Sequence, residues 1–326
     1  MLVSKTFMKN FKLVVLRYHI KVLDKLILPE FPGSTLRGGF GNAFRQITCT
    51  QKKTDCHKCL LITSCPFGYI FSTEPERNTA RLKNIMDIPR PYVIRPCNNT
   101  GGEHSEGEHI DFEQVIIGKA IDFLPYFIVA FKELGEIGLG SGKGRYELKN
   151  AYITKPKNNY TEIYNIDRGA ISYSEDIITL WQDIIGSQYK KPREVEINFI
   201  TPLRLEVENV LLEWAPEFDE LILNLVRRTN NMAYFHCDII DELNFAEIKE
   251  KSYNIDIVDS DIKVVNWSRY SERQDKRIPL KGIIGSVVYK GEIKPFLPLL
   301  RLGEYINIGK NTTMGMGRIE ITDIDI

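Results

Sequence analysis

Residues 301–318 read RLGEYINIGKNTTMGMGR, and this stretch decides the fold of the C-terminal half of the chain. The apolar run before it, residues 295–302, predicts a helix, and residues 319–326 after it predict a strand. Closely spaced glycines let a backbone turn tightly and present its N–H groups to a ligand. The glycine-rich part carries Lys310 and Arg318 and no acidic residue, so we expect this loop to suit a phosphate backbone.

An earlier stretch repeats this design. Phe123 and Phe296 each begin a Phe-Leu-Pro sequence that opens an apolar run, and a Gly-x-Gly-Arg sequence ends each region at Arg145 and Arg318. The separation from Phe to Arg is 22 positions in both copies. We interpret the pair as a diverged internal duplication, with a helix, a glycine loop and a strand in each half. The first loop adds two basic candidates for nucleic-acid contact, Lys143 and Arg145.

The composition is that of an ordinary globular protein. The chain has 326 residues, 43% of them apolar and 26% charged, and this length allows two domains. The formal net charge is zero, so a nucleic-acid partner must bind a local basic patch. The longest apolar run, residues 123–131, is far too short to cross a bilayer. The N-terminus lacks the pattern of a cleavable signal peptide, and we expect a cytoplasmic protein with no membrane partner.

Four cysteines lie within 17 residues in the pattern C-x6-C-x2-C-x5-C, namely Cys49, Cys56, Cys59 and Cys65. A C-x2-C pair can place two thiolates on one metal ion, and two further thiolates complete a tetrahedron. The spacing therefore predicts a metal site. Structural zinc is the first choice, and a 4Fe–4S cluster, which also takes four cysteine ligands, is the alternative.

A short helix is predicted over residues 36–47, after one or two strands in residues 12–28. Its first turns are crowded by glycines, each of which costs roughly 1 kcal/mol relative to alanine. Such a cost indicates close backbone contact, either with a neighbouring element of the fold or with a ligand. The glycines are Gly38, Gly39 and Gly41, and the polar residues that could face a nucleic acid are Arg37 and Arg45.

Residues 264–270 and 282–289 predict a paired hairpin in the second half. The segment between them combines aromatic residues with a local surplus of positive charge, a composition typical of RNA contacts. A solvated hairpin face explains the same composition equally well. The candidate contacts are Arg269, Arg273 and Arg277.

The glycine loop, the duplication and the cysteine cluster together carry a resemblance to a known family. In this combination the chain resembles the CRISPR-associated endoribonucleases that process precursor crRNA, within the RAMP superfamily. The similarity is closest to the subgroup with a cysteine cluster after the first helix. The stretches that carry the resemblance are residues 35–41, 56–71, 123–148, 267–288 and 296–319.

This resemblance implies an α+β fold. We expect tandem ferredoxin-like (RAMP/RRM-like) domains with antiparallel sheets, a glycine-rich loop near the C-terminus and an inserted metal-binding cysteine loop. The predicted division is an N-terminal domain over residues 1–155 with the cysteine loop at 49–65, a connector over 156–192, and a C-terminal domain over 193–326.

The resemblance also implies metal-independent cleavage within CRISPR repeat RNA. The 2′-OH attacks the adjacent phosphate and leaves a 2′,3′-cyclic phosphate and a 5′-OH. A base takes the 2′ proton, an acid protonates the leaving oxygen, and cations stabilise the charge of the phosphorane. The basic residues named above would then contact the repeat RNA.

Many members of this family use a histidine in or after the first helix, often with a tyrosine or lysine. The helix predicted over residues 36–47 contains none of these three residue types. His57, which follows the helix inside the cysteine cluster, is the first candidate acid or base, and its rival roles are packing beside the metal or ligating it. His19 in the first strand is the second candidate. Some superfamily members use lysine and arginine clusters, so Lys52, Lys53 and Lys58 stay open.

Two other functions fit the same pattern. A non-catalytic RAMP subunit would bind crRNA within a CRISPR effector complex, and the missing helix histidine favours this alternative. A metal-bearing nucleic-acid-binding regulator without a CRISPR role is more distant. Two nearly complete half-repeats with a C-terminal glycine loop favour the processing endoribonuclease.

Overall fold

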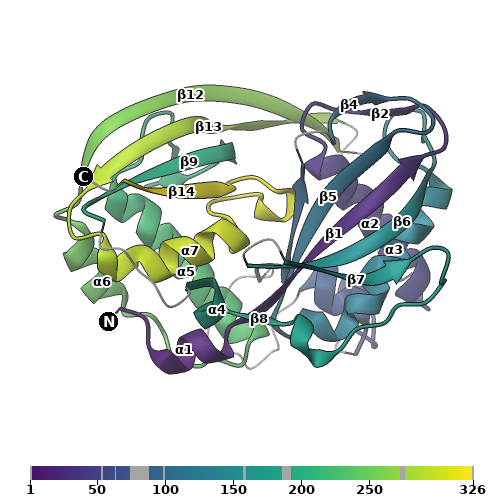
Figure 1. Ribbon diagram of the computed structural model, residues 1–326, viewed down its shortest axis with the longest axis horizontal. Coiled ribbons are helices and arrows are strands. Elements are labelled where there is room, and N and C mark those ends of the chain that lie inside the picture. Colours follow the sequence, from purple (N-terminus) through teal and green to yellow (C-terminus); the bar gives the residue numbers. More distant parts are fainter. Residues whose placement is uncertain are drawn as a thin grey trace. The chain divides into compact units, whose positions relative to one another are not determined.

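The structure is a computed structural model that describes residues 2–52, 54–62, 64–73, 88–97, 100–156, 159–185, 192–271 and 276–324 (Figure 1). The chain forms two compact units. The N-terminal unit comprises Leu13–Thr179 with Phe235–Cys237, and the C-terminal unit comprises Met1–Lys12, Leu180–Tyr234 and Asp238–Ile326. Among the described residues, no helix has the length and apolar character needed to cross a membrane.

The unit boundaries differ from the predicted division at residues 155 and 193. The first unit continues to Thr179, because part of the predicted connector belongs to its sheet. Strand β7 (Asn159–Asn165) pairs antiparallel with β6 (Tyr146–Lys155). β7 is an edge strand of this sheet, and an edge strand can be as polar as a linker. The polar composition of the segment therefore led to the prediction of a connector.

The N-terminal unit has a βαββαβ core. Its sheet has the strand order β3-β5-β1-β6-β7, and the pairings of β1 with β5 and β6 are antiparallel. This order, with the first strand between the third and the fourth, is that of a ferredoxin-like domain. The core elements are β1 (Lys12–Val22), α2 (Gly33–Thr48), β3 (Tyr92–Pro96), β5 (His109–Ile117), α3 (Leu124–Ile137) and β6. Outside the core, β2 (Leu26–Leu28) pairs with β4 (Gly102–His104), and β8 (Thr179–Leu180) pairs with β1.

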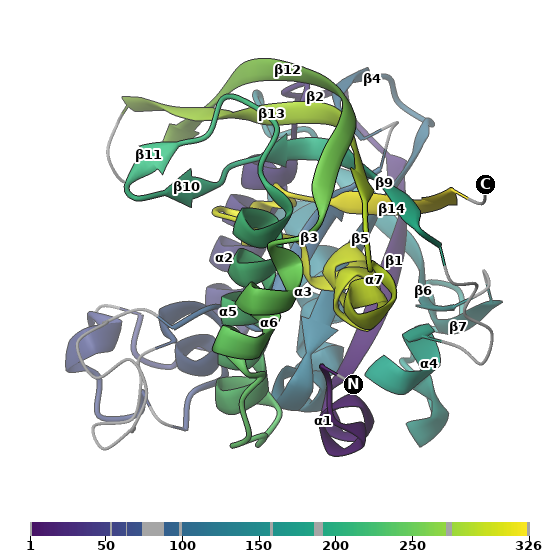
Figure 2. The same cartoon turned by 90° about the vertical axis from the view of Figure 1, so that its left-hand side faces the viewer.

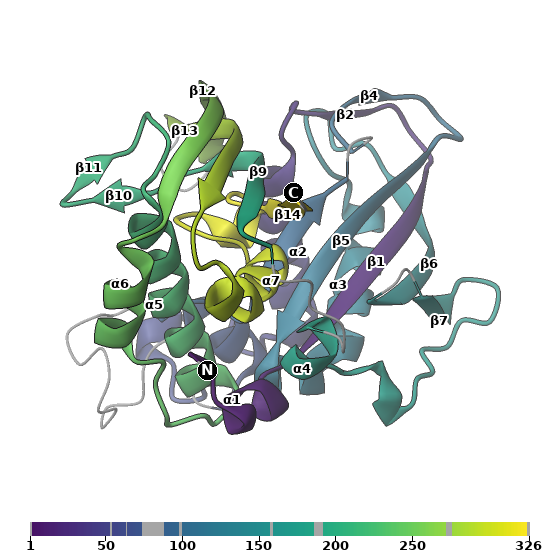
Figure 3. The same ribbon diagram turned by 60° about the vertical axis from the view of Figure 1, so that its left-hand side comes forward.

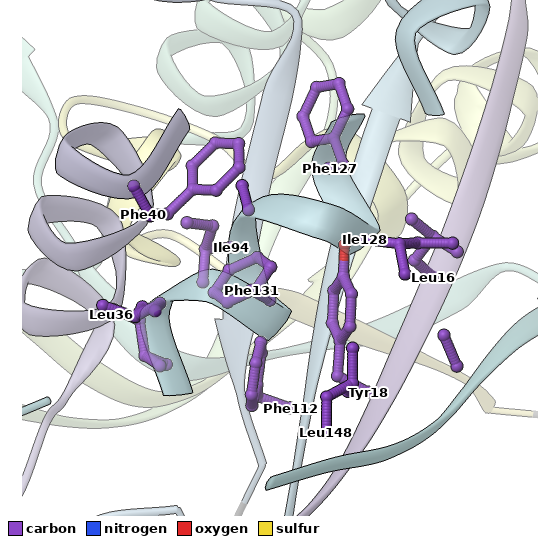
Figure 4. Packing of buried hydrophobic residues seen from close by; sticks show 14 of the residues in the cluster. Leu16, Tyr18, Leu36, Phe40, Ile94, Phe112, Phe127, Ile128, Phe131 and Leu148 are labelled. Atoms are coloured by element: carbon purple, nitrogen blue, oxygen red, sulfur yellow. The ribbon is translucent and has the colours of Figure 1, made fainter. Parts of the chain in front are cut away.

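Alternating side chains of β1 separate the two faces of this sheet. Leu16, Tyr18 and Ile20 are buried, whereas Arg17 and His19 between them are half-buried. The buried side chains pack with the aromatic residues of α2, α3 and β5 in one apolar cluster (Figure 4). The opposite face therefore presents polar side chains from β1 and its neighbours.

The crowded glycines of α2 serve helix packing at two of the three positions. A Cβ on Gly39 would lie 2.9 Å from the side chain of Leu134 on α3, and a Cβ on Gly41 would lie 2.8 Å from Phe71. At Gly38 a Cβ would meet no heavy atom of the described residues within 4 Å. Contact with neighbouring elements, the first of the two predicted explanations, therefore applies to Gly39 and Gly41.

The C-terminal unit repeats the βαββαβ order. Its sheet has the strand order β12-β13-β9-β14, with all three pairings antiparallel, and α5 and α7 lie on one side of it (Figure 2). The core elements are β9 (Glu194–Leu203), α5 (Phe218–His236), β12 (Asp256–Ser271), β13 (Lys276–Lys290), α7 (Leu297–Ile306) and β14 (Ile319–Ile324). The remaining elements are α1 (Lys5–Asn10), α4 (Trp181–Ile185), β10 (Glu206–Val207), β11 (Val210–Leu211) and α6 (Phe245–Ser252).

The predicted helix, loop and strand are present in both halves. A 3-10 turn leads into α3 and α7, each helix has a proline in its first turn, and the N-cap residues are Phe123 and Phe296. After the glycine loop, β6 and β14 each pair with the first strand of their own unit, β1 and β9. The two units thus have the same topology, as the duplication predicted.

Candidate functional site

The C-terminal glycine loop, residues 307–318, is fixed by hydrogen bonds within its unit. Its Ile308 N–H donates to the carbonyl of Gly317 at 2.9 Å, and the Gly317 N–H donates to Pro202 at 3.0 Å. The Lys310 N–H donates to Arg204 at 2.9 Å. These three amides are used by the protein, so the expectation that the loop presents its N–H groups to a ligand does not hold for them. The cationic side chains of the loop are candidate contacts for an anion.

The basic side chains of the loop lie beside acidic ones. Lys310 pairs with Glu206 of β10, and the guanidinium of Arg204 lies 3.6 Å from the same carboxylate. The hydrogen bond from Lys310 is the main reason that the pKa of Glu206 lies below its ordinary value. Arg318 lies 3.2 Å from Glu320. The loop itself contains no acidic residue, but its cations pair with carboxylates from outside the loop. RNA phosphates would have to compete with Glu206 and Glu320 for Lys310 and Arg318.

In the N-terminal unit, the corresponding glycine loop carries two exposed cations, Arg145 and Lys143. The side chain of Arg145 lies 2.6 Å from Asp24, and both are well exposed. Lys143 is exposed and has a positive φ of 53°. Ion pairs at such exposed sites contribute little to stability, so Arg145 can exchange its partner for a phosphate at low cost.

The two arginines of α2 lie over aromatic rings. The guanidinium of Arg37 is 5.6 Å from the centre of the Phe71 ring, and that of Arg45 is 5.7 Å from Phe67. Arg45 also donates to the carbonyls of Lys52 and Thr54, at 3.1 and 3.3 Å. Arg45 thereby holds the start of the cysteine loop.

The predicted hairpin is confirmed, and one of its three candidates is described in full. Strands β12 and β13 pair throughout, with Trp267 opposite Leu280 and Arg269 opposite Ile278. Arg269 is half-buried. Arg273 lies outside the described residues, and of Arg277 only the backbone, in β13, is described.

The four clustered cysteines are thiols, and all are half-buried. Cys49 caps the end of α2, and Cys56 begins a 3-10 turn (Cys56–Lys58) that Cys59 caps. Within the described part of the chain, which lacks Lys53 and Thr63 of this loop, no three His, Cys, Asp or Glu side chains are close enough to hold a metal ion. The structure therefore does not support the predicted metal-binding loop. Zinc, the 4Fe–4S alternative and the cysteine-cluster subgroup remain predictions from sequence.

The zinc prediction has a direct test in the double variant Cys56→Ser, Cys59→Ser. A structural metal contributes its binding free energy to folding, so loss of two ligands is expected to lower the melting temperature and remove the metal. The measurement is metal content and thermal melting of anaerobically purified protein. An unchanged melting temperature, or wild-type protein without metal, would contradict the prediction.

The two candidate histidines have different surroundings. His57 is exposed in the 3-10 turn, where its backbone N–H donates to the Asp55 carboxylate at 3.0 Å. His19 lies on β1. This strand is in the middle of the N-terminal sheet, between β5 and β6 (Figure 3). The Nδ1 atom of His19 is 2.7 Å from Oδ1 of Asp111, whose second oxygen accepts from Arg17 at 2.8 Å.

His19 belongs to a group of polar residues that we call the sheet-face cluster. It consists of Arg17 and His19 on β1, His109 and Asp111 on β5, and Tyr152 on β6. Antiparallel pairing places Asp111 opposite His19, and Tyr152 opposite Arg17, and directly opposed residues share a face. The His109 ring stacks on that of His19, with centroids 4.8 Å apart and an interplanar angle of 10°.

Sequence reasoning missed four members of this cluster, Arg17, His109, Asp111 and Tyr152. The alternation within residues 12–22 does place Arg17 on the face of His19. His109 and Asp111 could not be added, because they reach His19 only through the register of β5 against β1.

Asp111 is the carboxylate that Arg17 and His19 of the cluster both contact. Burial alone would raise the pKa of this carboxyl, but hydrogen bonds from Arg17 and His19 outweigh burial and lower it. Its hydrogen bond in turn raises the pKa of Arg17. Burial, with Glu162 and Asp111 nearby, raises the pKa of Tyr152, which stays a neutral phenol at pH 7. An imidazole held by a carboxylate beside a guanidinium is suited to proton transfer next to an anion.

Two ferredoxin-like units, each with a glycine loop before its last strand, define a protein of the RAMP type. Residues 11–176, about half of the chain, match the family model AF_1859_N, described as "N-terminal domain". Residues 197–319 match the model of "CRISPR-associated endoribonuclease Cas6". The chain belongs to the family of CRISPR-associated Cas6 endoribonucleases.

Individual proteins are similar to this chain over most of its length. An uncharacterized protein of Archaeoglobus fulgidus is 24% identical over 302 residues, which cover 90% of this chain and 92% of the relative. The structure of Thermus thermophilus Cas6 matches with a TM-score of 0.55 and 10% identity, covering 96% of this chain and 99% of that one. A Cas6 product complex matches with a TM-score of 0.56 and 11% identity, covering 95% and 99%. At these identities the structures establish similarity of fold.

Proposed function

We propose that this protein is an endoribonuclease that cleaves within CRISPR repeat RNA without a metal ion. The observation that carries the proposal is the match of residues 197–319, which include the C-terminal glycine loop, to the Cas6 endoribonuclease model. The sheet-face cluster supplies the acid–base and cationic groups that such a reaction needs. CRISPR repeat RNA is the proposed partner.

In the proposed reaction the ribose 2′-oxygen forms a bond to the adjacent phosphorus, and the bond from phosphorus to the 5′-oxygen breaks. The products are a 2′,3′-cyclic phosphate and a 5′-OH. A base accepts the 2′ proton, and an acid gives a proton to the leaving 5′-oxygen. His19 is the proposed acid, because the Asp111 carboxylate, 2.7 Å from its Nδ1, fixes the orientation of its ring. Arg17 is the proposed cation for the phosphorane charge.

His19 is a better candidate than His57, the first choice from sequence. The side chain of His19 has a carboxylate within hydrogen-bond distance and an arginine on the same carboxylate. A catalytic ring needs an orienting partner, and Asp111 is that partner for His19. His57 is exposed in its turn, whereas His19 is half-buried beside an arginine, a setting suited to proton transfer next to an anion.

RNA binding by the C-terminal loop is tested with Lys310→Ala combined with Arg318→Ala. Each phosphate contact in a single strand contributes about 0.7 to the slope of log affinity against log salt, so the slope is expected to flatten by about 1.4. Affinity at low salt falls at the same time. The control is Lys251→Ala, which removes an exposed cation of α6 that pairs with Glu247. An unchanged slope in the double variant would place the phosphate contacts elsewhere.

The test of the reaction is incubation of the purified protein with labelled repeat RNA in excess EDTA, followed by end-group analysis. One cut that leaves a 2′,3′-cyclic phosphate supports the proposal. A substrate with a 2′-deoxy nucleotide at the cleavage position should bind and stay intact, because the nucleophile is missing.

A second candidate function is a non-catalytic crRNA-binding subunit of a CRISPR effector complex. The observation that favours it is α2, which contains no histidine, tyrosine or lysine over Gly33–Thr48. This candidate predicts tight binding of the repeat RNA without a cut under any buffer condition. The EDTA assay, repeated with added divalent ions, therefore separates the two functions.

A further inference from the structure

The sheet-face cluster contains a second imidazole, His109, that the proposed reaction has not yet used. Its ring lies parallel to that of His19 with 4.8 Å between the centroids. The two residues come from neighbouring strands, and Asp111, two positions beyond His109 on β5, is the residue opposite His19. The ring of His109 is therefore diagonal to that of His19 on one face of the sheet.

The backbone fixes the position of His109. The turn before it closes with hydrogen bonds between Val22 and residues 107 and 108, since the Gly107 N–H donates to Val22 at 2.8 Å and the Val22 N–H donates to Glu108 at 2.9 Å. His109 itself pairs with Lys21 as the first residue of β5. The His109 side chain is thus exposed, while its backbone is held at the hydrogen-bonded start of β5. A catalytic group needs such support from a regular element of the fold.

The charges around the two rings favour unequal roles. Asp111 and Arg17 lie on the side of His19, where the carboxylate is 2.7 Å from Nδ1 of the ring. On the side of His109, β1 presents Lys21, and β6 presents Glu147 opposite Lys21. Two further titratable residues lie opposite Arg17, namely Glu113 on β5 and Tyr152 on β6. The two rings therefore have different charged neighbours, and this difference suits them to different roles in one reaction.

We propose that His109 is the general base that works with His19 as the general acid. Neutral His109 takes the proton of the 2′-OH as the 2′-oxygen bonds to phosphorus, and protonated His19 gives its proton to the 5′-oxygen as that oxygen leaves. One proton enters the pair and one leaves it, so the total charge of the two rings is unchanged. Asp111 is a positioning residue that acts through His19. This inference rests on the proposed endoribonuclease function.

The test is single-turnover cleavage of repeat RNA in EDTA across a pH series, with RNA affinity measured in parallel. His109→Ala is expected to slow cleavage roughly 10²- to 10⁴-fold with little change in affinity, and to lose the rise of rate with pH that a general base produces. His109→Gln, which keeps a polar side chain of similar size, should behave alike. The matched control is His104→Ala on β4, whose ring contacts Glu108 and the Thr100 carbonyl, and it should keep the wild-type pH profile.

The outcomes separate the two proposals. If the wild-type protein cleaves and both His109 variants match it in rate and pH profile, the inference about His109 is overturned and the endoribonuclease function stands. If both variants lose affinity as much as rate, His109 is an RNA contact and its role as a base is overturned. If the wild-type protein binds the RNA and does not cleave it, the proposed function fails and the inference fails with it.

Discussion

Replacement of His19 by alanine is expected to slow single-turnover cleavage of repeat RNA by roughly 10²- to 10⁴-fold, the usual contribution of a general acid. RNA affinity should stay near that of the wild type, because the proposed phosphate contacts Lys310 and Arg318 belong to the other unit. His19 is half-buried at the sheet surface, so the variant should fold. The measurement is the rate of product formation with enzyme in excess over RNA.

The matched control is His57→Ala, which removes the first catalytic candidate from sequence and should cleave at the wild-type rate. Asp111→Asn gives a second readout, because it keeps the shape of the side chain and removes the negative charge beside His19. We expect it to lower the rate less than His19→Ala and to shift the pH profile. A large loss of rate in His57→Ala together with wild-type cleavage by His19→Ala would reverse the assignment.

Replacement of Gly317 by alanine is expected to lower the free energy of unfolding by about 2 to 4 kcal/mol. Gly317 has a φ of 69°, in the left-handed region that disfavours residues with a Cβ. A Cβ at this position would also lie 1.8 Å from the carbonyl oxygen of Ile308, which is backbone and cannot move aside easily. The loop that carries Lys310 would have to rearrange, so RNA affinity should fall as well.

Gly142→Ala in the first glycine loop is the control for Gly317→Ala. Gly142 has a φ of 86°, but a Cβ there would meet no heavy atom of the described residues within 4 Å. Its cost should be limited to the backbone conformation, about 1 to 2 kcal/mol. Denaturant unfolding of both variants measures the difference. Equal destabilisation would mean that the contact with Ile308 adds nothing.

The repeated elements of the fold could be predicted because their signals are local. The helix with a proline in its first turn, the glycine loop and the following strand each occupy a continuous stretch, and α3 and α7 begin where the Phe-Leu-Pro sequences predicted. The hairpin of β12 and β13 was also predicted, since alternating apolar residues flank a polar segment. Such local periodicity of apolar residues can be read from the sequence without knowledge of the tertiary structure.

The side chains that meet across strands could not be predicted. His19 and Asp111 are 92 positions apart in sequence and become neighbours through the pairing of β1 with β5. Glu206 likewise joins Lys310 across 104 positions, which changes the surroundings of a loop whose own sequence is free of acids. Register and long-range ion pairs depend on tertiary packing, and composition and spacing do not encode them.

The measurement that tests the central claim most directly is cleavage of labelled CRISPR repeat RNA by the purified protein in excess EDTA, with end-group analysis of the products. The account predicts one cut that leaves a 2′,3′-cyclic phosphate and a 5′-OH, and no cut in a substrate with a 2′-deoxy nucleotide at that position. Tight binding with intact RNA, or cleavage that needs a divalent metal ion, would contradict it.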